Sequence, residues 1–335
     1  MKPTALIRIL AQAFRNRLKV LIVSSPGIGK SALVTLAAQK AEADLIVMHP
    51  AVSDPTDFKG MPAVVKAGAR SVAEFLPFGS LRKLVEATAL TVCFIDDIGQ
   101  APHAVQAALM QLIQAREVDG TRISDHVVFV GATNDSSHMA GVSSILEPVK
   151  SRWDTIIPLV ADVDDWVAWA LQAKIAPQVI AFIRFRPELL NQFKPTRELI
   201  NSPCPRTVES VSKWVSAGIE DSLILAGAAG QGFATEFCAF LSVWRAVPDL
   251  DSIIADPSHA MLPDFHNPSL VVALACALSF KINPTNFPNV LTYLERLPKE
   301  YEMLAVRDAT ARDPNLTGTA TYTQWALKNQ AIFAR

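Results

Sequence analysis

Short runs of valine, isoleucine and leucine recur through the first 160 residues, with helical or loop patterns between them. The runs cover residues 19–24, 45–48, 91–95, 127–130 and 155–159. Near-continuous apolar runs of this length predict strands covered on both faces, and their alternation with helices predicts a parallel sheet with right-handed crossovers. Residues 1–160 are therefore expected to form one α/β domain.

Helices of this domain are predicted from apolar positions that recur every three or four residues. Before the fourth strand, one face collects Val105, Ala108, Leu109, Leu112 and Ile113, and this face is expected to pack on the sheet. Residues 1–19 combine basic positions with short apolar pieces and lack the uninterrupted apolar region and small-residue cleavage site of a secretory signal. They are expected to form an amphipathic first helix.

Two polar interruptions of this domain have the pattern of hairpins. Residues 64–75 place an Ala-Gly turn between two β-prone pieces, and residues 117–126 contain an Asp-Gly dipeptide of the kind that closes hairpins. Ordinary surface loops are the alternative for both segments. As hairpins, they would project from the body of the domain.

Beyond Pro158 the strand signals stop and the pattern becomes helical. We expect an α-helical lid domain over 161–235, starting with a helix that Asp162 or Asp164 caps and whose tryptophans face inward. A helix over 206–217 follows a group of prolines, and a C-terminal helical region is expected over 236–335. The most apolar piece, 270–278, is about half of what a bilayer span needs and predicts a buried helix instead.

Charge and cysteine usage narrow the class of protein. With 31 basic and 32 acidic residues the formal charge is −1, so no overall field attracts nucleic acid or an anionic membrane, and any such contact must be local. The four cysteines form no CxxC pair, which argues against a zinc site or a disulfide framework. Reduced, buried thiols are expected, as suits a cytoplasmic protein.

The stretch SSPGIGKS, residues 24–31, follows the first strand and precedes a helix. A loop that binds a triphosphate needs inward main-chain N–H groups, a helix N-terminus, a lysine for the β- and γ-phosphates and a hydroxyl for Mg²⁺. The residues in these places are, in order, Pro26, Gly27, Ile28, Gly29, Lys30 and Ser31. The full pattern begins with a glycine, where this chain has Ser24. A chance strand–turn–helix without a ligand is the alternative.

The apolar strand TVCFI ends in two acids, Asp96 and Asp97. A nucleotide site needs a carboxylate at the end of a neighbouring strand to hold the metal and a second group to orient the attacking water. We assign Asp96 to Mg²⁺ and Asp97 to the water. A solvated turn is the alternative, and the side chain of Asp97 is shorter than the glutamate that would reach the same water, which would make hydrolysis slow or gated.

The order SSPGIGKS, FIDD, VFVGATND and SRWD resembles the AAA+ ATPases, and DPTDFKG, QAALMQLIQAREVDG and SPCPRTVE resemble their MoxR branch most. The resemblance covers roughly residues 15–235. It implies a P-loop AAA+ core with a five-stranded parallel sheet, followed by an α-helical lid, with MgATP as the ligand. It also implies that Asn134, after Thr133 at the end of the fourth strand, is a polar sensor for the attacking water or γ-phosphate; a helix cap is the alternative.

Two arginines receive roles from the same resemblance. Arg152 in SRWDT matches the finger that a neighbouring subunit inserts into the site, and Arg206 in CPRTVE matches the second sensor on the lid. A planar guanidinium can hold two phosphate oxygens and stays charged. A surface arginine and a helix-terminal arginine are the respective alternatives. A finger in trans implies a homo-oligomeric ring, usually of six subunits.

The leading hypothesis is a MoxR-type ATPase that remodels or activates a partner protein, which in relatives of this type is often a von Willebrand factor A domain protein. Neither a metal-ligand spacing among the six histidines nor a serine nucleophile elbow suggests other chemistry. A nucleic-acid motor or loader with basic hairpins (Lys66, Arg70, Arg122) is the second hypothesis. A nucleotide-gated assembly protein with little hydrolysis is the third.

Overall fold

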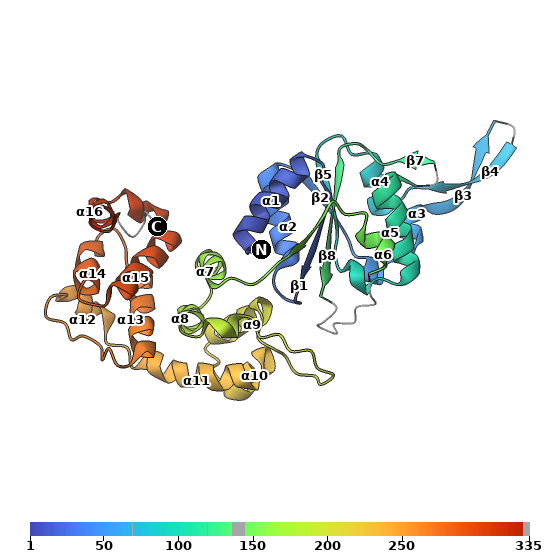
Figure 1. Ribbon diagram of the computed structural model, residues 1–335. Coiled ribbons are helices and arrows are strands. Elements are labelled where there is room, and N and C mark those ends of the chain that lie inside the picture. The colour runs from blue at the N-terminus through green and yellow to red at the C-terminus, as the bar shows by residue number, and fades with distance from the viewer. Residues whose placement is uncertain (69, 119, 136–144, 331–335) are drawn as a thin grey trace. The chain divides into compact units, whose positions relative to one another are not determined.

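A computed structural model describes residues 1–68, 70–118, 120–135 and 145–330, and over these residues the chain forms two compact units. The first comprises residues 1–161 and 193–197, and the second comprises residues 162–192 and the chain from residue 198 onward. Figure 1 shows an α/β unit and an all-helical unit. Each has a hydrophobic core of its own, and the two are described in turn.

The α/β unit is built on a five-stranded parallel sheet with the order β2-β5-β8-β1-β9. The strands are β1 (Val20–Ser24), β2 (Asp44–Met48), β5 (Thr91–Ile95), β8 (Val127–Asn134) and β9 (Thr155–Pro158). All five strands that the apolar runs predict are present, so the predicted fold class is confirmed. β8 continues past its apolar run to Asn134, and at Gly131 a Cβ would lie 2.7 Å from the ring of Trp153, so this position requires glycine.

Helices cover both faces of this sheet, as expected for near-continuous apolar strands. In β5, Val92 and Phe94 pack toward α1 (Pro3–Arg15) and α2 (Lys30–Ala41). The alternate residues, Cys93 and Ile95, pack on the opposite face. That face is covered by α3 (Thr56–Lys59), α4 (Gly79–Val85), α5 (His103–Ala115) and α6 (Glu147–Lys150). The apolar face predicted for α5 is buried, and α1 confirms the predicted amphipathic first helix.

Both predicted hairpins are present. β3 (Met61–Ala67) pairs antiparallel with β4 (Arg70–Leu76), and β6 (Glu117–Val118) pairs with β7 (Thr121–Arg122). The β3–β4 hairpin extends away from the α/β body (Figure 1). At its base the main chain of Gly60, with φ +97°, runs so close to Leu76 that a Cβ would lie 2.9 Å from the Leu76 carbonyl oxygen. Glycine is required there for both its conformation and its lack of a side chain.

The helical unit begins with α7 (Val163–Gln172), which Asp162 caps by accepting the Asp165 N–H. Trp166 is buried as predicted, whereas the inward orientation predicted for Trp169 is wrong, since that residue is 42% exposed. Further along are α8 (Pro177–Phe185), α9 (Pro205–Ser216), α10 (Ser222–Ala229), α11 (Gln231–Arg245), α12 (Leu250–Ala255), α13 (Pro268–Lys281), α14 (Phe287–Leu294), α15 (Lys299–Arg312) and α16 (Ala320–Lys328). Residues 271–279 of α13 are all buried, which confirms the predicted buried helix.

The expected boundary at residue 235 falls inside α11. Phe182 of α8 packs with its ring centroid 5.2, 5.1 and 5.5 Å from those of Phe233, Phe237 and Phe240, three aromatic residues of α11 on both sides of that boundary. The helices of 162–192 and those of 236–330 therefore share packed side chains within one compact unit.

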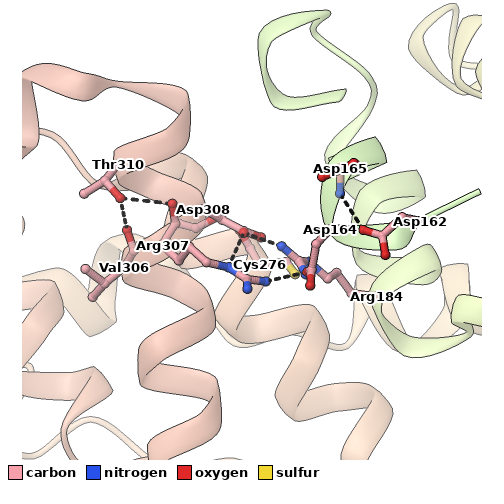
Figure 2. Close-up of polar contacts among 10 residues, drawn as sticks. Asp162, Asp164, Asp165, Arg184, Cys276, Val306, Arg307, Asp308 and Thr310 are labelled. Atoms are coloured by element: carbon pink, nitrogen blue, oxygen red, sulfur yellow. Dashed lines mark hydrogen bonds and ion pairs between the residues drawn. The ribbon is translucent and has the colours of Figure 1, made fainter. Parts of the chain in front are cut away.

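Ion pairs join the same helices (Figure 2). Arg184 of α8 donates to Asp164 of α7 at 2.7 Å and to Asp308 of α15 at 2.6 Å. Asp308 is 2% exposed, and burial raises the pKa of its carboxyl group, an effect that the neighbouring Arg184 guanidinium opposes. Arg307 adds a second bond to Asp164 at 3.0 Å. The charge of the buried Asp308 carboxylate is compensated mainly by Arg184, since Arg307 Nε lies farther away, at 3.9 Å.

All four cysteines are free thiols: Cys93, Cys204 and Cys276 are buried, as expected, while Cys238 is partly exposed. Burial raises the pKa of Cys93 to about 12. Among the described residues, no helix has the length and apolar character needed to cross a membrane.

Candidate nucleotide-binding site

The predicted phosphate loop lies between β1 and α2. β1 ends at Ser24, and α2 begins at Lys30 with Gly29 as its N-cap. Gly27 and Gly29 have φ values of +75° and +99°, which L-residues with a side chain rarely adopt. The glycines therefore allow a tight turn from a buried strand into the N-terminus of a helix, and helix N-termini at such turns commonly bind anions.

Lys30 is buried against three oxygen atoms. Its Nζ donates to Asn134 Oδ1 at 2.7 Å, to Ser24 Oγ at 3.2 Å and to the Ser25 carbonyl oxygen at 3.4 Å. Parallel pairing of β1 with β8 sets Ser24 directly opposite Asn134. The lysine and the predicted sensor, 104 positions apart in the chain, are therefore in direct contact at one edge of the sheet.

The two predicted metal ligands are also in contact. Ser31 Oγ donates to Asp96 Oδ2 at 2.6 Å, and the other oxygen of Asp96 accepts the main-chain N–H of Asp97 at 3.0 Å. The main-chain N–H of Asp96 donates to the Met48 carbonyl oxygen at 2.9 Å, which ties the end of β5 to the end of β2. Asp96 is thus fixed at the carboxyl edge of the sheet, next to the first turn of α2.

Asp97 has a left-handed main chain, with φ +54° and ψ +39°. Residues other than glycine seldom adopt this conformation, and aspartate is among those that tolerate it. Such conformations concentrate at functional sites, where the surrounding fold holds them. Asp97 is half-buried and is the N-cap residue of the short 3₁₀ turn Ile98–Gln100. It is the next residue in the chain after Asp96.

The two arginines assigned by resemblance, Arg152 and Arg206, lie in segments other than the phosphate loop and the ends of β5 and β8. Arg152 follows α6, and its Nη1 donates to the Pro148 carbonyl oxygen and to Ser151 Oγ. Arg206 is an exposed residue in the first turn of α9, in the helical unit. Their roles at a neighbouring subunit and on a lid stay predictions.

Sequence reasoning took Ser24 only as a departure from the glycine of the motif, and it missed that the hydroxyl contacts Lys30. It also missed the Ser25 carbonyl oxygen as an acceptor. The available signal was a hydroxyl at the buried end of a strand, one residue before a loop that needs a lysine close by. Ser24 is 5% exposed.

Comparison with protein families matches residues 20–159 to the ATPase family associated with various cellular activities (AAA). None of the curated proteins compared with the chain is similar enough to count as a match. The matched segment spans β1 to the end of β9 and so includes the whole sheet and the phosphate loop.

Solved structures with a similar chain trace include RuvB from Thermotoga maritima, described as a Holliday junction branch migration motor, with 16% identity, a TM-score of 0.40 and 90% of this chain and 87% of that chain covered. NtrX from Brucella abortus in complex with ADP has 12% identity and a TM-score of 0.41, with 98% of this chain and 67% of that chain covered. These scores are too low to carry an argument about function. From the family match, the parallel sheet and the glycine loop after β1, we conclude that residues 20–159 form a domain of the AAA ATPase family.

Proposed function

We propose that this chain is a MoxR-type ATPase that hydrolyses MgATP at subunit interfaces and uses the energy to remodel or activate a partner protein. The proposal rests on one observation: at the carboxyl edge of the sheet Lys30 is hydrogen-bonded to Asn134, and the next residue, Ser31, is hydrogen-bonded to Asp96. A lysine, a hydroxyl, a carboxylate and an amide in that arrangement are what phosphoryl transfer needs.

Phosphate binding falls to the loop and the start of α2. The loop runs from Pro26 to Gly29. The main-chain N–H groups of Gly27, Ile28, Gly29 and the residues that follow surround the phosphates, and the ammonium of Lys30 turns to the β- and γ-phosphate oxygens. The helix N-terminus adds its partial positive charge. These groups bind ATP with its terminal phosphates at the end of β1.

One residue after β5 and one in the first turn of α2 fit a magnesium ion. Mg²⁺ prefers oxygen ligands and is usually held by one or two protein groups together with substrate phosphates. Ser31 Oγ and Asp96 Oδ2, 2.6 Å apart, are two such oxygens on adjacent elements. When bound there, Mg²⁺ would neutralise charge on the phosphate oxygens.

Asp97 and Asn134 act on the attacking water. Asp97 accepts a proton from the water while the water oxygen bonds to the γ-phosphorus. The bond between the γ-phosphorus and the oxygen that bridges it to the β-phosphorus breaks, which releases ADP and phosphate. Asn134 can orient the water or the γ-phosphate once Lys30 has turned to the nucleotide. The left-handed main chain of Asp97 supports this role, because conformations of that kind concentrate at functional sites.

The ring, the finger and the lid complete the proposal. Arg152 of one subunit stabilises the charge on the phosphoryl group bound by its neighbour, and Arg206 reports that charge to the helices of the lid. The assembly is a homo-oligomeric ring of six subunits. Hydrolysis then changes the interface and moves the helical unit.

Mixing two inactive variants tests the shared site. Asp97→Asn lacks the proton acceptor and Arg152→Ala lacks the finger, so each alone should lose at least about tenfold in phosphate release. In a co-assembled mixture some interfaces combine an intact Asp97 with an intact Arg152, and activity should return in part. If a mixture shown to co-assemble stays inactive, Arg152 is not the finger.

A protein partner is supported by the β3–β4 hairpin. Met61, Val64, Phe75 and Leu76 are 52%, 77%, 39% and 42% exposed. Exposed apolar side chains on a projecting hairpin are typical of protein interaction surfaces. The same hairpin also exposes Lys66 and Arg70, and recognition of nucleic acid relies on basic residues, so the experiment below includes DNA as an outcome. We place the partner contact here. A von Willebrand factor A domain protein is the proposed partner class, and the free thiols support the cytoplasm as the location.

Trapping the partner tests the hairpin. Asp97→Asn protein with ATP should keep the partner bound during affinity purification, because the closed state cannot hydrolyse its nucleotide. Adding Val64→Asp and Phe75→Asp should reduce recovery of that partner about tenfold or more. Val52→Asp is the matched control, since Val52 is 87% exposed and lies outside the hairpin. Equal recovery with and without the hairpin changes, or recovery of DNA alone, would contradict the proposal.

A further inference from the structure

The ammonium of Lys30 is fully occupied within the protein itself. A lysine ammonium has three N–H donors, and among the residues that the structure describes three oxygen atoms lie within bonding distance of Nζ: Asn134 Oδ1, Ser24 Oγ and the Ser25 carbonyl oxygen. A phosphate oxygen that binds Lys30 must therefore replace at least one of these acceptors. An ATP that takes two donors, one for each of its last two phosphates, must replace two.

One of the three acceptors belongs to the residue at which this chain departs from the motif. The phosphate-loop pattern has a glycine at the position of Ser24, and a glycine offers no side-chain oxygen. The Ser24 hydroxyl donates its own proton to the Ser25 carbonyl oxygen at 2.9 Å, which leaves its lone pairs for the ammonium at 3.2 Å. Ser24 is 5% exposed, so water does not substitute readily for either partner.

The metal ligands of the same site are bonded to each other in a comparable way. Ser31 Oγ donates to one oxygen of Asp96, and the Asp97 N–H donates to the other. The loop lysine and the ligand pair thus both have protein partners that a nucleotide and its metal would have to displace. Ser24 adds one more such partner than a glycine would.

We propose that Ser24 is a positioning residue that competes with nucleotide phosphates for the ammonium of Lys30 and so lowers the affinity of the site for both ATP and ADP. This inference rests on the proposed function of the loop. Without the Ser24 hydroxyl, a nucleotide that binds Lys30 has one fewer hydrogen bond of the ammonium to replace, and this holds for ATP and for ADP. Because a net hydrogen bond changes an equilibrium by about three- to tenfold, binding of MgADP and MgATP should tighten by that factor, and by a similar factor for both.

The expected kinetic signature differs from that of a structural defect. Tighter binding that is equal in the ground state and in the transition state lowers KM and leaves kcat unimproved. Loss of loop structure would instead raise KM and lower kcat together. Ser24→Ala removes only the oxygen and keeps the Cβ, and Ser24→Gly restores the residue of the motif, so the two variants should behave alike.

Titration calorimetry of the full chain with MgADP and with a non-hydrolysable ATP analogue tests the inference. Thr35→Val is the matched control: Thr35 lies on α2, the helix that begins with Lys30, and its hydroxyl donates to the Ser31 carbonyl oxygen. We expect a Kd about fivefold lower for both Ser24 variants and an unchanged Kd for Thr35→Val. Unchanged or weaker binding by both Ser24 variants, with wild-type binding intact, would overturn the inference alone. A wild-type chain that binds neither nucleotide at millimolar concentration would overturn the proposed function as well.

Discussion

Replacing Lys30 by alanine should abolish nucleotide binding at ordinary concentrations. The substitution removes the charge-assisted hydrogen bonds to the β- and γ-phosphates, each of which contributes about 1.5–3 kcal/mol, so the Kd for MgATP should rise about 100-fold or more. Phosphate release should fall to the background rate. Calorimetry with MgATP and a phosphate-release assay on the purified chain measure the two effects.

Folding must be checked in the same variant because Lys30 is buried. Its removal leaves Asn134 Oδ1 and Ser24 Oγ without this donor, at a cost of about 1–3 kcal/mol in the free energy of unfolding. Lys40→Ala is the control: Lys40 is an exposed lysine in the last turn of the same helix, α2, and its loss should change neither binding nor turnover. If a folded Lys30→Ala chain bound MgATP with the wild-type Kd, the loop would not be the phosphate-binding site.

Replacing Arg184 by methionine should cause the largest loss of stability among the substitutions considered. Methionine keeps much of the length of the side chain but leaves Asp308, 2% exposed, without its 2.6 Å ion pair. Removal of one partner of a buried pair costs about 3–5 kcal/mol. Urea denaturation should show that loss at neutral pH. Arg186→Met is the control, since Arg186 is 39% exposed and pairs with Glu188 and Glu236 at the surface, where pairs contribute about 0–1 kcal/mol.

The deficit of Arg184→Met should shrink as the pH falls. Burial raises the pKa of Asp308 in the folded protein, with Arg184 opposing that shift, so without the arginine the folded-state pKa rises further. A folded state that binds more protons than the unfolded chain loses stability as pH rises through the folded-state pKa, and regains it on acidification. A second check is Arg184→Met combined with Asp308→Leu, which removes both charges and should recover most of the stability. A deficit independent of pH, or no recovery in the double variant, would contradict this account.

The Arg184–Asp308 ion pair connects two regions that the sequence pattern predicted to be separate domains. Asp164 and Arg184 belong to the expected lid, whereas Asp308 belongs to the expected C-terminal region. Prolines and changes of composition mark breaks between helices, but they carry no information on which helices pack together. The continuous helix α11 and its contacts with Phe182 come from packing between segments about 50 residues apart, and only the folded chain shows them.

The sequence by itself determined the local structure and the chemistry of the α/β unit. Runs of β-branched residues specify strands because such side chains suit a pleated, covered surface. The glycines, the lysine and the acids predict a phosphate site because few residue types perform those tasks. β-prone pieces around turn residues predicted the hairpins, with surface loops as the alternative, and the cap was predicted at Asp162 or Asp164; the structure has both hairpins and the cap at Asp162.

Only the tertiary structure decided which of these groups meet. The parallel register of β1 and β8 set Ser24 beside Asn134, and so set both against Lys30. The exposure of Trp169 and the burial of Asp308 also depend on neighbours far away in the chain. Spacing along a sequence fixes which residues share a helix or a strand, but strand order and helix packing fix distances between elements, and it is those distances that determine what each side chain can bind.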